Sequence, residues 1–387
     1  SRIDTGIGEL NRVLGGGLVP GSLTLISGEP GIGKSTIIIQ AAAHIAASKG
    51  TVLYVSGEES EEQIKIRADR VCDKLPEDLY ILAETNIDVI AEACQQLNPV
   101  FLIIDSIQTM YTSDIESAPG SVSQVRTCGN ELMRIGKMHG IPVFIVAHVT
   151  KSGDLAGPRI VEHMVDCVLY FEGESAGAFR CLRAAKNRFG STNEIGVFEM
   201  ADGGLTEVPN PSETLLAGRP EEAPGTCVTC VMEGVRPVLA EVQALVVPSS
   251  LGNPRRVSNG VDYNRAMLLL AVLEKRGGLM LSGCDAYVNV IGGLSLEEPA
   301  ADLAAMIAFA SSFRDRPVPS DLAAIGEIGL TGELRAVSAL GQRLSEVRRL
   351  GFTKCLIPKR VQGKLSVPEG LDVIRVANIR EALAAIL

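Results

Sequence analysis

A glycine-rich stretch, GEPGIGKST, carries the clearest chemical signal in this sequence. It consists of Gly28, Glu29, Pro30, Gly31, Ile32, Gly33, Lys34, Ser35 and Thr36, and it fits the pattern G-x-x-x-x-G-K-[ST]. In such a loop, glycines turn backbone N–H groups inward around phosphate, Lys34 can reach the β and γ oxygens, and the Ser35 hydroxyl can bind Mg²⁺. An apolar run precedes the stretch and a helical pattern follows it. We therefore interpret it as a nucleotide-binding loop and not as a chance turn.

Acidic residues end two other apolar runs. Asp105 closes FLIID, and Glu58 and Glu59 follow TVLYVSG. The carboxyl ends of parallel strands meet at one edge of a sheet, so Asp105 is expected beside the loop, as a magnesium ligand together with Ser35. Hydrolysis also needs a group that orients or deprotonates water, and we predict Glu58 for this task with Glu59 as its assistant. The alternative for Glu59 is a solvated acid favoured near a helix N-terminus.

A histidine ends the apolar run IPVFIVAH. His148 precedes a segment in which Lys151 and Arg159 stand among glycines. A histidine at a strand end is often structural, but this position would neighbour the γ-phosphate of a bound nucleotide. We predict that His148 senses that phosphate and couples hydrolysis to the segment that follows.

The pentapeptide KNRFG follows the strand-like run FRCLRAA. Lys186 and Arg188 are one residue apart, so both side chains project to the same side of an extended chain. No acidic cluster follows nearby, which raises the question of which anion these two cations meet. The alternative is a solvated basic hairpin.

Strands and helices alternate in the first half of the chain. The apolar strands are separated by helices that begin at Lys34 and Glu61, which predicts an α/β fold with a parallel sheet covered on both faces over residues 1–208. The Pro-, Gly- and Glu-rich residues 209–225 are expected to form a linker. Residues 226–387 begin with strands and continue with helices near 263–275 and 299–312, as in a separate α+β domain.

Composition limits the class of protein. The 387 residues are 46% hydrophobic and 21% charged, and the formal net charge of −10 argues against bulk electrostatic attraction to nucleic acid. No apolar stretch is long enough to span a membrane, and we expect a cytoplasmic protein. Most of the nine cysteines lie in apolar runs. Cys227 and Cys230 have the spacing of zinc ligands, but TCVTCV alternates as a strand does and no second Cys or His pair accompanies it.

These motifs together give the chain a family resemblance. The opening TGIGELNRVLGGGLVPGS, the nucleotide loop, Glu58, Glu59 and Asp105 resemble RecA-like P-loop ATPases, and KNRFG is similar to the signature of the bacterial RadA (Sms) family of DNA repair ATPases. The resemblance implies a ring of identical subunits, a hexamer, with ATP and Mg²⁺ between neighbours. Lys186 and Arg188 would then act as arginine fingers on the adjacent subunit's γ-phosphate. Members of the family usually begin with a four-cysteine zinc ribbon, and this chain starts after it.

The same resemblance implies partners. Single-stranded and branched DNA are the expected substrates, with the RecA recombinase as a protein partner. The segment TMYTSDIESAPGSVSQVR, with Tyr111 and Arg126, and the segment from Lys151 to Arg159 occupy the places of DNA-binding loops, where binding would be mostly electrostatic with stacking by Tyr111. A second basic stretch contains Arg255, Arg256 and Arg265, which could bind phosphate without reading sequence. The alternative for that stretch is a solvated, partly paired helix face.

The second half resembles the proteolytic domain of Lon, but two residues differ from that family. Gly341 stands where Lon has its catalytic lysine, and Ala300 stands where Lon has its nucleophilic serine. A Ser/Lys dyad needs both the hydroxyl and the amine. We therefore predict a Lon protease-like domain without proteolytic activity.

The resulting hypothesis is an ATP-dependent DNA motor of recombination repair that acts on branched intermediates, as a DnaB-type ring helicase does. One alternative is a KaiC-like regulatory ATPase with a protein partner, which DNA-stimulated hydrolysis would distinguish. Another is a nucleotide-switched assembly scaffold, whose oligomers would need ATP binding but not turnover.

Overall fold

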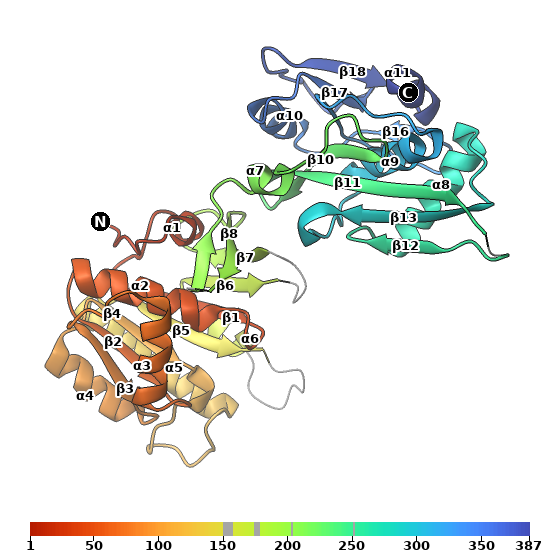
Figure 1. The fold of residues 1–387 in the computed structure, drawn as a ribbon. Coiled ribbons are helices and arrows are strands. Elements are labelled where there is room, and N and C mark those ends of the chain that lie inside the picture. The colour runs from red at the N-terminus through yellow and green to blue at the C-terminus, as the bar shows by residue number, and fades with distance from the viewer. Residues whose placement is uncertain (150–157, 174–178, 203, 251) are drawn as a thin grey trace. The chain divides into compact units, whose positions relative to one another are not determined.

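The computed structural model describes residues 1–387 except 150–157, 174–178, 203 and 251. The chain forms two compact units (Figure 1). The first unit contains residues 1–175 and 179–209, and the second begins at Asn210 and ends at Leu387.

The first unit is built on a nine-stranded sheet with the order β3-β2-β4-β5-β1-β6-β7-β8-β9. Six strands run parallel: β1 (Leu23–Gly28), β2 (Val52–Ser56), β3 (Leu79–Ala83), β4 (Phe101–Asp105), β5 (Val143–His148) and β6 (Cys167–Glu172). Three antiparallel strands extend it: β7 (Phe179–Asn187), β8 (Ile195–Ala201) and β9 (Gly204–Glu207). The predicted parallel sheet is confirmed for the first six strands. The last three are antiparallel because the short connections between them leave no room for a crossover helix.

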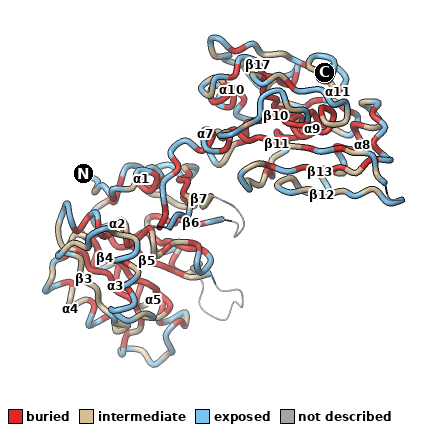
Figure 2. The backbone as a smooth tube through the Cα atoms, viewed as in Figure 1, coloured by how far each residue is buried: buried red, intermediate tan, exposed pale blue. Residues whose placement is uncertain are grey.

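Helices cover both faces of this sheet, and each face has its own core. On one face, β1 residue Ile26 packs with α1 (Gly8–Leu14), α2 (Lys34–Ser48) and α3 (Glu61–Val71). On the other, Leu25 packs with α4 (Ile87–Leu97), α5 (Val122–His139) and the short α6 (Pro158–Glu162). Successive strand residues point to opposite faces, so a strand buried on both sides is apolar throughout. Figure 2 shows these strands as a buried layer.

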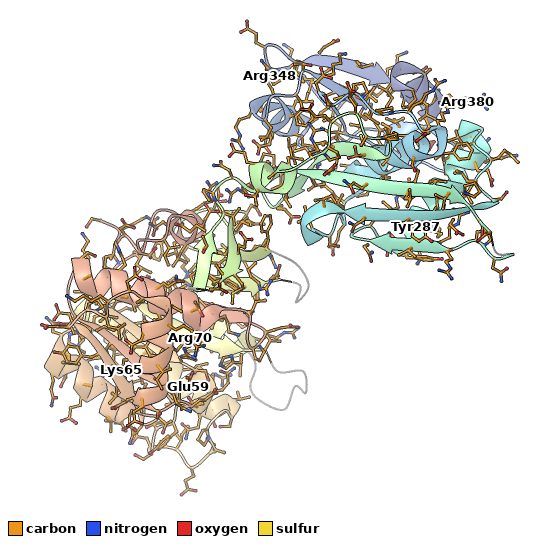
Figure 3. The ribbon with its side chains drawn as sticks, viewed as in Figure 1. Glu59, Lys65, Arg70, Tyr287, Arg348 and Arg380 are labelled. Atoms are coloured by element: carbon orange, nitrogen blue, oxygen red, sulfur yellow. The ribbon has the colours of Figure 1, made fainter. Side chains whose placement is uncertain are left out.

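The second unit has a seven-stranded mixed sheet with the order β12-β13-β11-β10-β14-β17-β18. Its strands are β10 (Thr226–Glu233), β11 (Arg236–Pro248), β12 (Arg256–Asn259), β13 (Cys284–Val290), β14 (Leu322–Ala324), β17 (Lys354–Pro358) and β18 (Asp372–Val376). A two-stranded sheet joins β15 (Glu327–Ile328) to β16 (Leu334–Arg335). The helices are α7 (Pro211–Leu216), α8 (Tyr263–Gly277), α9 (Asp302–Arg314), α10 (Leu340–Arg349) and α11 (Ile379–Ile386). Figure 3 shows Tyr287 on β13 and Arg380 on α11.

The expected linker contains a helix instead. Residues 211–216 form α7, and the Ser212 hydroxyl accepts the backbone N–H of Leu239 and donates to Glu346. These buried bonds fix α7 to the core of the second unit, whereas residues 217–224 form no helix or strand. A six-residue helix is too short to show the apolar periodicity on which the expectation was based.

The pair Cys227 and Cys230 lies in β10, where both side chains are buried. Burial raises the pKa of Cys227 to about 12, and it raises the pKa of Cys230 further. Among the described residues, no group of three His, Cys, Asp or Glu side chains could hold a metal ion. None of the helices in the described ranges combines the length and the apolar character that a bilayer span requires.

Candidate active site

The loop between β1 and α2 has the geometry that its glycines allow. Gly31 and Gly33 have φ angles of 80° and 118°, a region that side chains with a Cβ avoid. A Cβ on Gly33 would also lie 2.9 Å from Cδ1 of Leu205 in β9. Helix α2 begins directly after Gly33, with no side-chain cap on its first N–H groups in the described structure. The loop and the helix start therefore present backbone donors at one place, as phosphate binding requires.

Lys34 is folded back onto this loop. Its ammonium donates to the carbonyl oxygens of Gly28 and, at 3.2 Å, of Glu29. The side chain is only 3% exposed, and burial lowers the pKa of Lys34 to about 8 against the opposing effect of Asp105 and Glu29. A phosphate at the loop would offer Lys34 a charged acceptor in place of two carbonyl groups.

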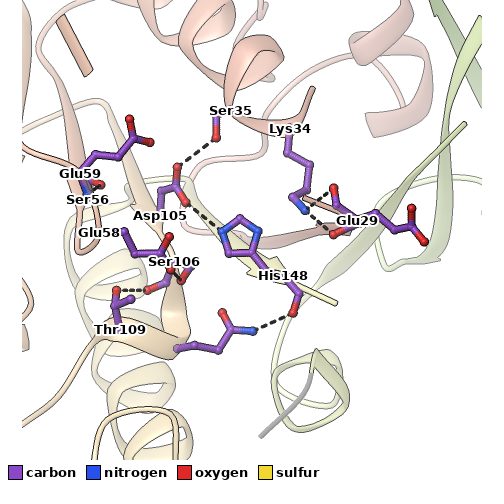
Figure 4. Close-up of polar contacts among 12 residues, drawn as sticks. Glu29, Lys34, Ser35, Ser56, Glu58, Glu59, Asp105, Ser106, Thr109 and His148 are labelled. Carbon is purple, nitrogen blue, oxygen red and sulfur yellow. Dashed lines mark hydrogen bonds and ion pairs between the residues drawn. The ribbon is translucent and has the colours of Figure 1, made fainter. Parts of the chain in front are cut away.

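Asp105 at the end of β4 lies at the centre of the polar cluster in Figure 4. Its Oδ2 accepts from the Ser35 hydroxyl at 3.2 Å and from the Tyr54 hydroxyl at 2.7 Å. Hydroxyl and carboxylate oxygens are the ligands that magnesium prefers, so Ser35 and Asp105 fit this ion. Sequence reasoning missed Tyr54. The sequence could have indicated it, because Tyr54 stands inside the apolar run of β2 and a buried hydroxyl needs a hydrogen-bond partner.

The two glutamates after β2 differ in their contacts. The carboxylate of Glu59 pairs with Arg67 of α3 at 2.6 Å, and its backbone N–H bonds the Ser56 hydroxyl. The exposed Glu58 turns toward the other side, where Ser106 donates to it at 3.5 Å. Glu58 therefore contacts the residue that follows Asp105, and the Glu59 carboxylate is engaged by Arg67 of α3. The role of Glu58 in activating water, with Glu59 as its assistant, stays a prediction.

His148 connects the cluster to the end of β5. Its Nε2 is 3.8 Å from Oδ1 of Asp105, and its carbonyl accepts from the Gln108 amide at 3.2 Å. Gln108 belongs to the 3-10 turn Ile107–Thr109 that follows Asp105. Within the described part of the chain, His148 Nδ1 and Gln108 Oε1 are buried without a hydrogen-bond partner. Such atoms are costly unless a ligand completes them.

The two cations of KNRFG have separate partners in this chain. Lys186, in β7, donates to the carbonyl of Glu162 at 3.1 Å, and Arg188 pairs with Asp166 at 3.1 Å. A register shift in β6, between Val168 and Leu169, accompanies this part of the β6–β7 pairing. The Arg188 side chain is 57% exposed, so it can be reached from outside the unit.

Two of the predicted DNA contacts come together on the first unit. Arg126 of α5 and Arg159 of α6 line one groove of about 400 Å³ with Asn130 and His163. Tyr111 does not line this groove, because its backbone forms a bridge with Asn86. Lys151 lies outside the described residues.

The basic stretch of the second unit is largely engaged internally. Arg265 binds both carboxylate oxygens of the buried Asp302 and the carbonyl of Ile328, which agrees with the alternative of a partly paired helix face, and its predicted DNA contact stays a prediction. Arg256 donates to the carbonyl of Leu281 at 2.9 Å. Arg255 is the exposed member of the three, and its predicted contact stays a prediction.

The two positions compared with the Lon dyad on the basis of sequence resemblance carry no hydroxyl or amine. Ala300 is buried in the 3-10 turn Pro299–Ala301, and Gly341 lies in α10 with open space where a Cβ would stand. Nearby, the buried Arg343 forms an ion pair with Glu298 and donates to the carbonyl of Cys230 at 2.9 Å. Glu298 also accepts from the N–H of Met232. The polar groups here satisfy one another.

Comparison with known proteins agrees with this division. The family model of the AAA domain matches residues 1–154, and that of the Lon protease (S16) C-terminal proteolytic domain matches residues 284–387. Among solved structures, the RadB recombinase is similar to the chain, with 21% identity and a TM-score of 0.42 over 53% of this chain and 99% of that one. An ATPase domain of another protein is also similar, with 15% identity and a TM-score of 0.46 over 54% and 92%.

Full-length relatives identify the family. The DNA repair protein RadA of Bacillus subtilis is 57% identical over 382 residues, which is 99% of this chain and 83% of that protein. RadA of Halalkalibacterium halodurans is 55% identical over 386 residues, 100% of this chain and 84% of that protein. The first unit is thus a RecA-like P-loop ATPase core and the second an α+β Lon protease-like unit. The chain belongs to the DNA repair protein RadA family.

Proposed function

We propose that this ATPase is a DNA motor of recombination repair, which binds single-stranded DNA and drives branch migration of recombination intermediates as a six-membered ring. One observation carries the proposal. The nucleotide loop, Asp105 and His148 form one cluster at the carboxyl edge of the sheet, and α6, which presents Arg159 to a basic groove, belongs to the same unit. The name of the relatives, DNA repair protein, supports DNA as the substrate.

The described contacts give each residue of the ATP site a task. The loop N–H groups and Lys34 would hold the β- and γ-phosphates of a bound nucleotide, and Ser35 and Asp105 would hold magnesium. Magnesium, when bound, neutralises charge that develops on the phosphates. Glu58 orients and deprotonates the attacking water, a task supported by its contact with Ser106, the residue that follows Asp105. Glu59 keeps α3 in place through Arg67.

Lys186 and Arg188 serve the neighbouring subunit. In a ring, each cation would exchange its present partner, a carbonyl or the Asp166 carboxylate, for the neighbour's γ-phosphate. The exposure of Arg188 permits this exchange. His148 contributes from within the same subunit by contacting the γ-phosphate with the imidazole that now faces Asp105.

The groove between α5 and α6 is the proposed path of single-stranded DNA. Arg126 and Arg159 supply positive charge along it, and this binding does not depend on base sequence. Lys151, Tyr111 and Arg255 remain candidate contacts outside this groove. The second unit acts as a non-proteolytic scaffold, and RecA is the proposed protein partner on the basis of family resemblance.

The test is DNA-stimulated ATP hydrolysis. We expect single-stranded DNA to raise turnover and the variant Arg126→Ala/Arg159→Ala to lose the stimulation while it keeps hydrolysis without DNA. Arg134→Ala is the matched control, because Arg134 is exposed on the same helix α5 but pairs with Glu131 outside the groove. Turnover that DNA does not change, with oligomers that form on ATP binding alone, would instead support an assembly scaffold.

A further inference from the structure

Glu162, the last residue of α6, takes part in two contacts that reach different regions. Its backbone carbonyl accepts from the Lys186 ammonium at 3.1 Å. Its carboxylate accepts from the hydroxyl of Tyr170 in β6. Glu162 therefore joins β7, which ends in the KNRFG segment, to β6, which ends beside the nucleotide loop.

Tyr170 connects Glu162 to the nucleotide loop. It pairs in register with Ser27 at the end of β1, and it lines a cleft of about 280 Å³ together with Gly28, Glu29 and Ile32. Burial, aided by the bond to Glu162, raises the pKa of Tyr170 to about 12. The phenol thus stays protonated at working pH and remains the donor in this bond. The position of its ring is also held from the other side, because the Arg183 guanidinium lies 5.6 Å above it.

Helix α6 is short enough to depend on these contacts. It has five residues, from Pro158 to Glu162, and so short a helix is not stable by its own hydrogen bonds. Val161 anchors it to the core, and Glu162 fixes its end. Arg159 lies three residues before Glu162, so the placement of Glu162 determines where Arg159 enters the groove with Arg126.

We propose that Tyr170, Glu162 and Lys186 form a junction that sets the position of α6 according to nucleotide occupancy, with Tyr170 and Glu162 as positioning residues. This inference rests on the proposed function. Tyr170 responds to the subunit's own nucleotide cleft, and Lys186 responds to the neighbour's nucleotide. When the Lys186 ammonium moves toward a neighbouring phosphate, its bond to Glu162 lengthens, and the Tyr170 bond alone holds the end of α6. The affinity of Arg159 for DNA then depends on both nucleotides.

The experiment measures a coupling ratio, which is the dissociation constant for a labelled oligothymidine with ADP divided by that with a non-hydrolysable ATP analogue. Tyr170→Phe removes one hydroxyl and keeps the ring, and Glu162→Ala removes the acceptor but keeps the backbone carbonyl. Loss of a hydrogen bond to a charged group is worth about tenfold in an equilibrium constant, so each variant should lower the ratio by about that factor. The double variant should lower it no further, because both changes remove the same bond.

The controls separate this inference from the proposed function. Tyr80→Phe removes the hydroxyl of an exposed tyrosine in β3 and should leave the ratio unchanged. A ratio of one in the unchanged protein would overturn the proposed function, and the junction with it. Two results would overturn the junction and leave the proposed function standing. In the first, the unchanged protein has a coupling ratio above one and Tyr170→Phe has the same ratio. In the second, the effects of the two single variants on the ratio add up in the double variant. Because Tyr170→Phe preserves the ring and its packing, this variant alone tests the junction even if Glu162→Ala fails to fold.

Discussion

Two polar sites, one in each unit, differ in how fully their buried polar atoms are hydrogen-bonded. At the sheet edge of the first unit, His148 Nδ1 and Gln108 Oε1 are buried without a protein partner among the described residues. Near the dyad positions of the second unit, Arg343 and Glu298 bond to each other and to backbone groups. An unmade buried hydrogen bond costs about 1–3 kcal/mol.

That difference leaves buried polar atoms at the first site that a ligand or water can complete. The first site keeps costly unpaired atoms, which a bound nucleotide and water can complete. The second has Ala300 and Gly341 at the positions where resemblance to Lon predicts a nucleophile and a base, and its charged groups bond to one another. We therefore expect catalytic activity only at the site whose polar groups are free to bind a ligand, and not at every site that resembles an enzyme.

The largest effect is expected for the finger residue Arg188. Arg188→Ala should lower ATP turnover by about 10³ to 10⁵, because an arginine finger contributes that factor. Lys34→Ala should be equally inactive. Mixing the two variants should restore part of the activity, since some interfaces then combine an intact loop with an intact finger.

Turnover measured against mixing ratio checks this, with crosslinking to confirm mixed rings. Arg134→Ala serves as the control cation. Wild-type turnover by assembled Arg188→Ala subunits on DNA would show that KNRFG has another anionic partner.

A smaller loss is expected for the catalytic carboxylate. Glu58→Gln should lower turnover by about 10² to 10⁴ while nucleotide affinity is retained, because a general base acts only on the chemical step. Glu59→Gln should have a weaker effect, since Glu59 pairs with Arg67. The measurement is single-turnover hydrolysis beside equilibrium binding. Equal turnover by Glu58→Gln and the wild type would move the role to Glu59.

In the second unit, a change should affect stability and not catalysis. Arg343→Met leaves Glu298 without its partner and should lower the free energy of unfolding by about 3 kcal/mol, a typical cost of breaking a buried pair. Arg343→Met/Glu298→Met should recover part of that loss. Urea unfolding and ATP turnover are measured together. A selective loss of turnover in the folded variant would show that this pair belongs to an active site after all.

The smallest effect concerns pH. The pKa of Lys34 is about 8, so the ammonium is present below that pH and is lost above it. ATP affinity should fall as pH rises through 8, by at most about tenfold per unit. The pKa of Lys34 in the folded protein lies below the unfolded value of 10.5. Burial of the charged ammonium therefore lowers the free energy of unfolding by its full amount below pH 8, and this destabilisation disappears as the pH rises from 8 to 10.5. Lys34→Arg keeps its charge and should show no such change in affinity.

Sequence reasoning succeeded where a motif fixes geometry. The loop pattern determines where phosphate donors lie, and parallel strands necessarily bring Asp105 and His148 to the same edge. It did not find partners that are distant in sequence: Arg265 meets Asp302 only through the packing of α8 on α9, and Lys186 meets Glu162 only through the pairing of β6 with β7. Charge patterns show that a cation is present, but its partner depends on the tertiary fold.

The central claim is that all chemistry resides at the nucleotide edge of the first unit. It is tested most directly by measuring ATP and peptide hydrolysis in the same preparations of the unchanged protein, Lys34→Ala and Ala300→Ser. We predict that Lys34→Ala abolishes ATP turnover and that none of the three hydrolyses peptide, because Gly341 supplies no amine to activate Ser at position 300. Peptide hydrolysis by the unchanged protein, or ATP turnover that survives Lys34→Ala, would contradict the account.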